Sequence, residues 1–130
     1  MSEEMLLSAG YKKFAPGYYI DNRGIVYSTK TKRYIKPTTN MDGYLTTEIR
    51  INGVRKKIYN HIKVVEMFGD KNGNRIYPGL TNLLEHGISI DHIDNDKMNP
   101  RQSNLELVAH KLNCQRREER KSEICEELGF

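Results

Sequence analysis

The residues best suited to chemistry lie close together in the last third of the chain. Asp91 and His92 are adjacent, Asn104 follows after a polar loop, and Asn113 comes nine residues later. A neutral imidazole with an ordinary pKa of ~6.5 can accept a proton at cellular pH. Carboxylate and amide oxygens are the ligands that a hard divalent cation takes from proteins. These residue types suit a site that combines a base with a bound metal ion.

Two short strands and a helix must position this cluster. Apolar residues alternate in 88–92 and again in 105–108, which is typical of half-buried strands. The segment between them is rich in Asp, Asn and Pro and predicts a turn. Residues 109–128 favour a helix, which must pack on the strands because so small a sheet is unstable alone. Adjacent strand residues point to opposite faces, so Asp91 and His92 border one cleft only if the strand distorts where it leaves the hairpin.

The same residues resemble the motif of HNH (ββα-metal) endonucleases. Asp91-His92, Asn104 before Leu-Glu, and Asn113 are most similar to small phage-encoded, homing-type members with Asn at the third position, of the kind found in T-odd coliphages. Residues 59–68 also look like the helix before the nuclease hairpin. The resemblance implies an α+β fold. A β-rich DNA-binding region (1–58) precedes an HNH nuclease region (59–130), whose ββα-metal core spans about 88–117.

The resemblance also implies a metal-dependent hydrolysis of DNA phosphodiester bonds. His92 is then the general base, and Asp91 and Asn113 hold one divalent metal ion per site. Asn104 belongs to the catalytic set because it fixes the hairpin loop and orients His92. Asn at the third position, where His is commoner, favours Mg²⁺ or Mn²⁺ over zinc. His110 is a less favoured third ligand.

Two further histidines have a structural interpretation. His61 opens a helix over 60–68, for which Asn60 is the expected N-cap, and we expect its ring to pack or cap beneath the site. His86 ends a short helix predicted over 79–86.

The first half of the chain predicts strands. Residues 1–15 read as a weakly ordered arm, for which Leu6, Leu7, Tyr11 and Phe14 are the candidate anchors. The runs 18–20, 25–27 and 34–36 read as a small meander. Asn52-Gly53 is a strong hairpin signal. A two-residue turn there places Ile51 opposite Val54 and Arg50 opposite Arg55, with Glu48 opposite Lys57.

Basic charge is concentrated in this half. The 130 residues carry a net charge of +4, and residues 23–57 hold nine Lys or Arg against two acids, a net +7. The hairpin face that carries Arg50, Arg55 and Lys57 has two interpretations. The simpler one is an ordinary solvated face, and the favoured one is a surface that binds double-stranded DNA. The residues assigned to DNA binding are Arg50, Arg55, Lys57, Arg101, Arg116 and Arg117.

The chain carries two cysteines, Cys114 and Cys125. Within one helix they would lie roughly 16 Å apart, too far for a disulfide, so reduced thiols and a cytoplasmic location are expected, in the host cytoplasm if the protein is phage-encoded. Nothing in the sequence resembles a membrane span.

Two other functional classes stay open from the sequence. One is a non-catalytic DNA-binding protein that retains the HNH fold, and the other is a protein whose basic face binds an acidic protein. The sequence also leaves open whether a monomer nicks one strand or a homodimer cuts both, and it does not give the target site.

Overall fold

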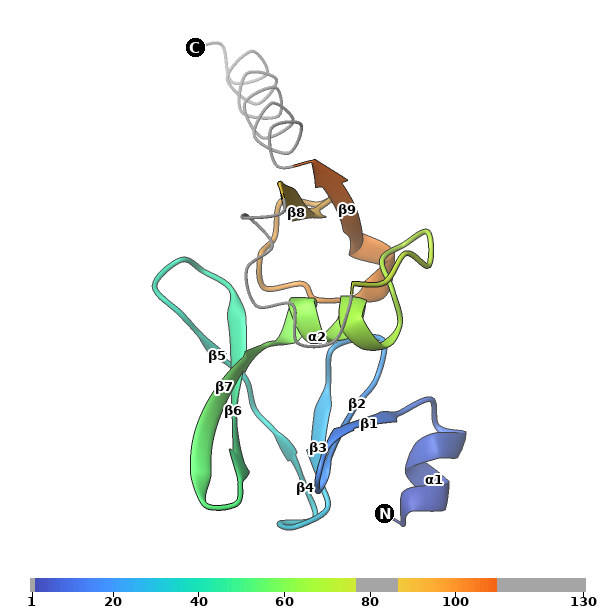
Figure 1. The fold of residues 1–130 in the computed structure, drawn as a ribbon, viewed down its shortest axis with the longest axis vertical. Helices are drawn as coiled ribbons and strands as arrows, with labels where there is room; N and C mark the ends of the chain where they lie inside the picture. Colours follow the sequence, from blue (N-terminus) through green and yellow to red (C-terminus); the bar gives the residue numbers. More distant parts are fainter. Residues whose placement is uncertain (1, 77–86, 110–130) are drawn as a thin grey trace.

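The computed structural model describes residues 2–76 and 87–109, which form a strand-rich α+β fold. Three antiparallel sheets have the strand orders β1-β2-β3-β4, β5-β6-β7 and β8-β9 (Figure 1). The elements are α1 (Glu3–Ser8), β1 (Lys12–Ala15), β2 (Tyr18–Ile20), β3 (Val26–Ser28), β4 (Arg33–Ile35), β5 (Thr38–Thr39), β6 (Leu45–Ile51), β7 (Val54–Tyr59), α2 (Asn60–Met67), β8 (Ile88–His92), the 3₁₀ helix η2 (Gln102–Asn104) and β9 (Leu105–Ala109).

Several predicted features lie outside the described residues. They are the short helix at 79–86, the helix predicted over 109–128 except for Ala109, which ends β9, and the residues His86, His110, Asn113, Cys114, Arg116, Arg117 and Cys125. Within the described part of the chain, neither α-helix has the length and apolar character that crossing a membrane requires.

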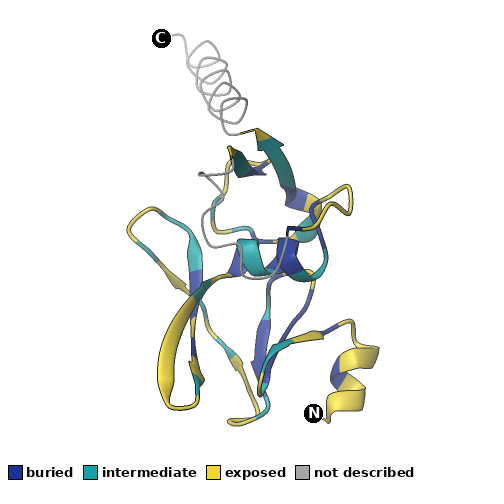
Figure 2. Cartoon of the chain, in the orientation of Figure 1, coloured by how far each residue is buried: buried dark blue, intermediate teal, exposed yellow. Residues whose placement is uncertain are grey.

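Helix α2 lies between the two N-terminal sheets and the β8–β9 hairpin (Figure 1). One apolar cluster joins all of these parts, and buried residues gather in β3 and α2 (Figure 2). The β-rich region and the region that follows it therefore share a core. The buried members of this cluster are Tyr18, Ile20, Val26, Ile49, Val64, Val65, Ile76, Ile90 and Leu105.

The β6–β7 hairpin has the predicted register. Ile51 pairs with Val54, Arg50 with Arg55, and Glu48 with Lys57. The turn residues Asn52 and Gly53 have φ values of 52° and 75°, as expected for a type I′ turn, whose twist matches that of the strands.

The prediction of a weakly ordered arm over residues 1–15 is wrong. Ser2 caps helix α1 by accepting a hydrogen bond from the Met5 amide, 3.3 Å away, and β1 then pairs with β2. Leu6 is fully buried in a second cluster with Tyr11, Tyr19 and Tyr27. The candidate anchors Leu6 and Tyr11 are indeed buried, but the tyrosines that they pack against, Tyr19 and Tyr27, come from distant strands and could not be identified from the local sequence.

Asn60 is not the N-cap of α2. Tyr59 occupies that position without a side-chain cap, and Asn60, 1% exposed, bridges two sheets. Its Oδ1 accepts a hydrogen bond from the Thr47 hydroxyl (2.8 Å), and its Nδ2 donates to the Gly24 carbonyl (2.9 Å). The local sequence predicted a helix cap at Asn60, whereas its hydrogen-bond partners Thr47 and Gly24 lie far away in the sequence.

The loop after α2 is joined to β9 by one carboxylate. Asp70 is fully buried. Its Oδ1 accepts hydrogen bonds from the amides of Asn72 and Asn74, and its Oδ2 accepts one from the Leu107 amide, all 2.9 Å long. The Lys71 amide also donates to the Leu105 carbonyl, 2.7 Å away. The loop is therefore held to the backbone of β9 by one side-chain carboxylate and one backbone amide.

We predict that Asp70→Ala lowers the free energy of unfolding by about 2–4 kcal/mol, because three amides lose a charged acceptor in a buried setting. The measurement is urea denaturation, with Asp42→Ala as the control. Asp42 is exposed, and its side chain makes no hydrogen bond within the described residues, so the control should change stability by less than about 0.5 kcal/mol. Equal midpoints for the two variants would contradict this role of Asp70.

Candidate active site

The β8–β9 hairpin carries the two adjacent candidate residues. His92 pairs with Leu105 and Asp91 with Glu106, in an unbroken register that begins at Ile88. The strand distortion considered from the sequence is therefore absent from this ladder. Because alternate residues of a strand face opposite sides, the His92 side chain lies on the face of the hairpin that carries Leu105. Asp91 and Glu106 share the other face.

His92 belongs to a cluster of four rings, which we call the ring cluster: Tyr44, Tyr59, His61 and His92. The His61 ring centre lies 4.9 Å from that of His92 and 4.9 Å from that of Tyr44, on which it stacks. Tyr44 also lies 5.7 Å from His92, and Tyr59 contacts the rings of Tyr44 and His61. These contacts restrict the orientation of His92, which is 3% exposed.

His61 is held neutral in this cluster. Burial, followed by the charge of His92, lowers the pKa of His61 from 6.5 to about 3. Its Nδ1 is buried and has no hydrogen-bond partner in the part of the chain that the structure describes. The cluster therefore brings His92 against a neighbour that does not compete for a proton near neutral pH.

Asp91 and Glu106 place two carboxylates directly opposite each other on one face of the hairpin. Like charges in such a pair are unfavourable without a cation nearby. The Lys71 ammonium lies 3.6 Å from Glu106, and Asp91 is 1% exposed. Oxygen donors of this kind fit a hard divalent ion. Among residues 2–76 and 87–109, no group of three or more His, Cys, Asp or Glu residues could hold a metal ion, and the other expected ligand, Asn113, lies beyond that range.

Asn104 holds the loop between the two strands. Its Oδ1 accepts a hydrogen bond from the Asp94 amide (3.0 Å), and its Nδ2 donates to Asp94 Oδ1 (2.9 Å) and to the Asn99 carbonyl (3.1 Å). The Asn104 carbonyl also accepts from the Ile93 amide. These bonds begin one residue after His92, so they fix the backbone that leaves the candidate base.

Asp94 is the other anchor of this loop. Burial raises the pKa of Asp94, but hydrogen bonds from the Asn99 side chain, the Asp96 amide and the Asn104 side chain outweigh it and give a net lowering. The loop is therefore organised around an ionised carboxylate at neutral pH.

The residues assigned to DNA binding on the β6–β7 hairpin are exposed. Arg50, Arg55 and Lys57 lie on one face, and the outer surface of β7 is largely exposed in Figure 2. Glu48 lies opposite Lys57 in the register and forms an ion pair with Arg55, whose Nε lies 3.5 Å from the Glu48 carboxylate. By strand alternation the same face carries Tyr44 and Tyr59, so it leads into the ring cluster.

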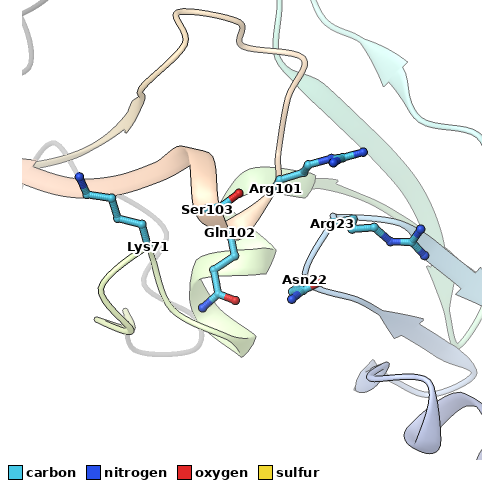
Figure 3. A pocket seen from close by; sticks show the side chains of 6 residues that line it. All are labelled: Asn22, Arg23, Lys71, Arg101, Gln102 and Ser103. Atoms are coloured by element: carbon cyan, nitrogen blue, oxygen red, sulfur yellow. The ribbon is translucent and has the colours of Figure 1, made fainter.

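Arg101 was also assigned to DNA binding from the sequence. It lies away from the β6–β7 hairpin, at a pocket that it lines together with Lys71 and Arg23 (Figure 3). Tyr44 and Glu106 lie next to the site, although neither was predicted from the sequence to do so. Strand alternation gave a signal for Tyr44, because it places that residue on the basic face of the hairpin. Glu106 follows from the register opposite Asp91 once the hairpin loop length is known.

Comparison with known proteins gives relatives of one kind. The chain is 31% identical over 105 residues to the H-N-H endonuclease F-TflI of Escherichia phage T5, an alignment that covers 81% of this chain and 48% of that protein. It is also 36% identical over 96 residues to an uncharacterized HNH endonuclease of Acanthamoeba polyphaga mimivirus. This second alignment covers 74% of this chain and 26% of that protein. The chain thus spans about half or less of these relatives. No family model matches it.

The fold has a solved counterpart. The structure of the HNH homing endonuclease I-HmuI, solved in a study of its DNA binding and cleavage, superposes on this chain with a TM-score of 0.65 at 24% sequence identity. The match covers 89% of this chain and 66% of the other.

The pKa of His61 predicts how stability depends on pH. Below pH 6.5 the unfolded chain protonates His61, whereas the folded protein does not do so until about pH 3. The free energy of unfolding should therefore fall as the pH is lowered through this range, by up to about 1.4 kcal/mol per pH unit from this group. Urea denaturation of wild type and His61→Phe from pH 7 to pH 4 measures it. Parallel stability curves for the two proteins would show that His61 is protonated in the folded state.

Replacement of Asn104 should release the loop. In Asn104→Ala the pKa of Asp94 is expected to rise, because one of the hydrogen bonds that lower it is lost, and the Asp94 amide should exchange faster with solvent. Both are measured by NMR, with Ser103→Ala as a neighbouring control that keeps the Asn104 bonds. An unchanged Asp94 in Asn104→Ala would exclude this role.

Proposed function

The chain belongs to the HNH endonuclease family, and we propose that it is a DNA endonuclease that hydrolyses phosphodiester bonds with a divalent metal ion and a histidine base. The observation that carries the proposal is the placement of Asp91 and His92 on consecutive positions at the end of β8. They stand where the ring cluster and the Asn104-anchored loop meet. Carboxylate, imidazole and fixed backbone are thus brought together at one end of a rigid hairpin.

In this proposal His92 removes a proton from the attacking water. The neutral His61 and the stacked Tyr44 hold the His92 ring, so less entropy is lost when a phosphate and a water are aligned against it. Asn104 acts as a positioning residue, because its hydrogen bonds reach the loop and not the ring.

The metal site is assigned to the other face of the hairpin. Asp91 and Asn113 would hold one Mg²⁺ or Mn²⁺, which when bound supplies charge neutralisation at the phosphate and at the leaving 3′ oxygen. The Glu106 carboxylate opposite Asp91 lies on the same face, where the Lys71 ammonium, 3.6 Å away, offsets its charge. Asn113 enters this set by its place in the motif.

The two faces of β8 suit the geometry of the reaction. In an in-line displacement the attacking and leaving oxygens lie on opposite sides of the phosphorus. A phosphate at the end of β8 would be approached by His92 from one side and by the Asp91 site from the other. Adjacent residues on a regular strand can therefore serve one reaction without any distortion.

We assign the binding of double-stranded DNA to the basic face of the β6–β7 hairpin. Arg50, Arg55 and Lys57 would contact phosphates, and the face runs through Tyr59 and Tyr44 to His92. The division into a DNA-binding region (1–58) and a nuclease region (59–130) follows from this assignment. Because the relatives come from a phage and a giant virus, the proposed place of action is the cytoplasm of the infected cell.

The decisive experiment is cleavage of supercoiled plasmid by wild type and His92→Ala in Mg²⁺, Mn²⁺ or EDTA. Wild type should nick or linearise the plasmid only with metal, and loss of the base should slow cleavage by about 10²–10⁴-fold. Nicked product indicates one-strand cleavage by a monomer, and directly linear product indicates a dimer. Asp91→Asn should lose activity and respond less to added metal.

Two controls make this result interpretable. Glu4→Gln changes an exposed residue of helix α1, outside the proposed catalytic and DNA-binding residues, and should cleave like wild type. Circular dichroism and urea denaturation establish that His92→Ala is folded. Equal cleavage by His92→Ala and wild type would reject His92 as the base. DNA binding by wild type without cleavage in any metal would leave a non-catalytic DNA-binding protein as the function.

A further inference from the structure

A basic pocket lies beside the candidate active site. It has a volume of about 370 Å³ and is lined by Asn22, Arg23, Lys71, Arg101, Gln102 and Ser103. In Figure 3, Lys71 lies on one side of Gln102 and Ser103, and the two arginines extend on the other. Cationic residues from three separate segments of the chain therefore line one polar cavity, and their charged ends extend on opposite sides of it.

These positive charges are only partly compensated. Arg23 is 2.7 Å from the Asp21 carboxylate, and the Lys71 ammonium is 3.6 Å from Glu106. Arg101 is exposed and has no ion-pair partner among the described residues. With three cations and two carboxylates, the pocket keeps a net charge of about +1. Like charges gathered in this way favour an anionic ligand.

The pocket walls are fixed by contacts between distant segments. The Gln102 amide donates to the Asn22 carbonyl (2.9 Å), and Gln102 Nε2 donates to the carbonyls of Phe68 and Asp70. Gly24 packs so tightly on Pro100 that an added Cβ would lie 2.6 Å from the proline ring. A preformed site of this kind binds a ligand without ordering its own backbone.

The lining indicates the class of ligand. None of the six described residues is aromatic and all are polar or charged, so the pocket offers no surface on which a base would stack. At roughly 30 Å³ per water molecule, 370 Å³ also has room for a hydrated phosphate group. A guanidinium fork matches phosphate oxygens in a bidentate geometry.

The pocket is rigidly connected to the proposed catalytic residues. Ser103 lies two residues before Leu105, which pairs with His92. Lys71 contacts Glu106, which pairs with Asp91. A phosphate held in the pocket would thus be at a fixed offset from the end of β8.

We propose that this pocket binds a backbone phosphate of the DNA substrate, at a position other than the bond that is cut. Arg101 is the principal contact, while Lys71 and Arg23 contribute through their charge. The inference rests on the proposed DNA endonuclease function and adds a positioning contact to it. Its role is to set the register of the strand on the β8–β9 hairpin.

The test is the salt dependence of DNA binding, measured by fluorescence anisotropy in EDTA with the full chain and a labelled duplex. Loss of one phosphate contact lowers the slope of log K against log salt concentration by about 0.9. Arg101→Gln should show this decrease, and Arg101→Lys should keep most of the slope. Arg101→Gln with Lys71→Gln should lose little more than Arg101→Gln, because the pocket holds a single phosphate. The control is Arg33→Gln, an exposed arginine of β4, which should bind like wild type.

A second arm separates DNA phosphate from free phosphate. Inorganic phosphate replaces chloride at constant ionic strength, and the melting temperature of each protein is recorded. If the salt slope of Arg101→Gln equals that of wild type, the inference is overturned. This holds even if free phosphate raises the melting temperature of wild type and not of Arg101→Gln, because the pocket then binds free phosphate and not DNA. Equal loss of slope in Arg33→Gln also overturns it, because the effect then reports total charge. Failure of wild type to bind DNA would instead reject the proposed function.

Discussion

The whole structure depends on one short helix that three small sheets must share. Sheets of four, three and two short strands bury too little apolar surface to be stable separately. Val64 and Val65 of α2 are fully buried in the cluster that joins them. Asn60 adds direction to this apolar contact, because its amide can satisfy Thr47 and Gly24 only in one arrangement of the sheets. The position of His92 relative to Tyr44 follows from that arrangement.

Features determined by neighbours in the sequence could be predicted, and those determined by distant partners could not. Asn52-Gly53 specified a hairpin and its register because its positive φ values admit one turn type. Helix α2 and strand β8 were likewise visible as apolar patterns. In contrast, α1 is held by Leu6 against tyrosines of β2 and β3, and the Asp70 clip needs β9. Contacts between distant segments produce no hydrophobic periodicity and no motif spacing from which they could be predicted.

The candidate site shows the same division. Asp91, His92 and Asn104 carried a recognisable spacing, and the bonds of Asn104 to the loop are of a kind that a turn sequence suggests. His61 was expected beneath the site, but its ring contact with His92 and its lowered pKa arise from burial. The distortion that would bring Asp91 and His92 to one cleft is absent from the β8–β9 ladder, so the carboxylate and the imidazole lie on opposite faces of the hairpin.

The loop after α2 has a consequence for how the protein behaves at high concentration. The outward-facing backbone groups of β9 at Leu105 and Leu107 would form an open strand edge, which is a template for pairing with another chain. Here the Lys71 amide and the Asp70 carboxylate already occupy them. The Asp70 carboxylate accepts the Leu107 hydrogen bond that the backbone of a neighbouring strand would otherwise accept. A side chain cannot continue a ladder of backbone hydrogen bonds to a further strand. The shortest sheet in the fold is thereby protected from edge-to-edge aggregation on this side.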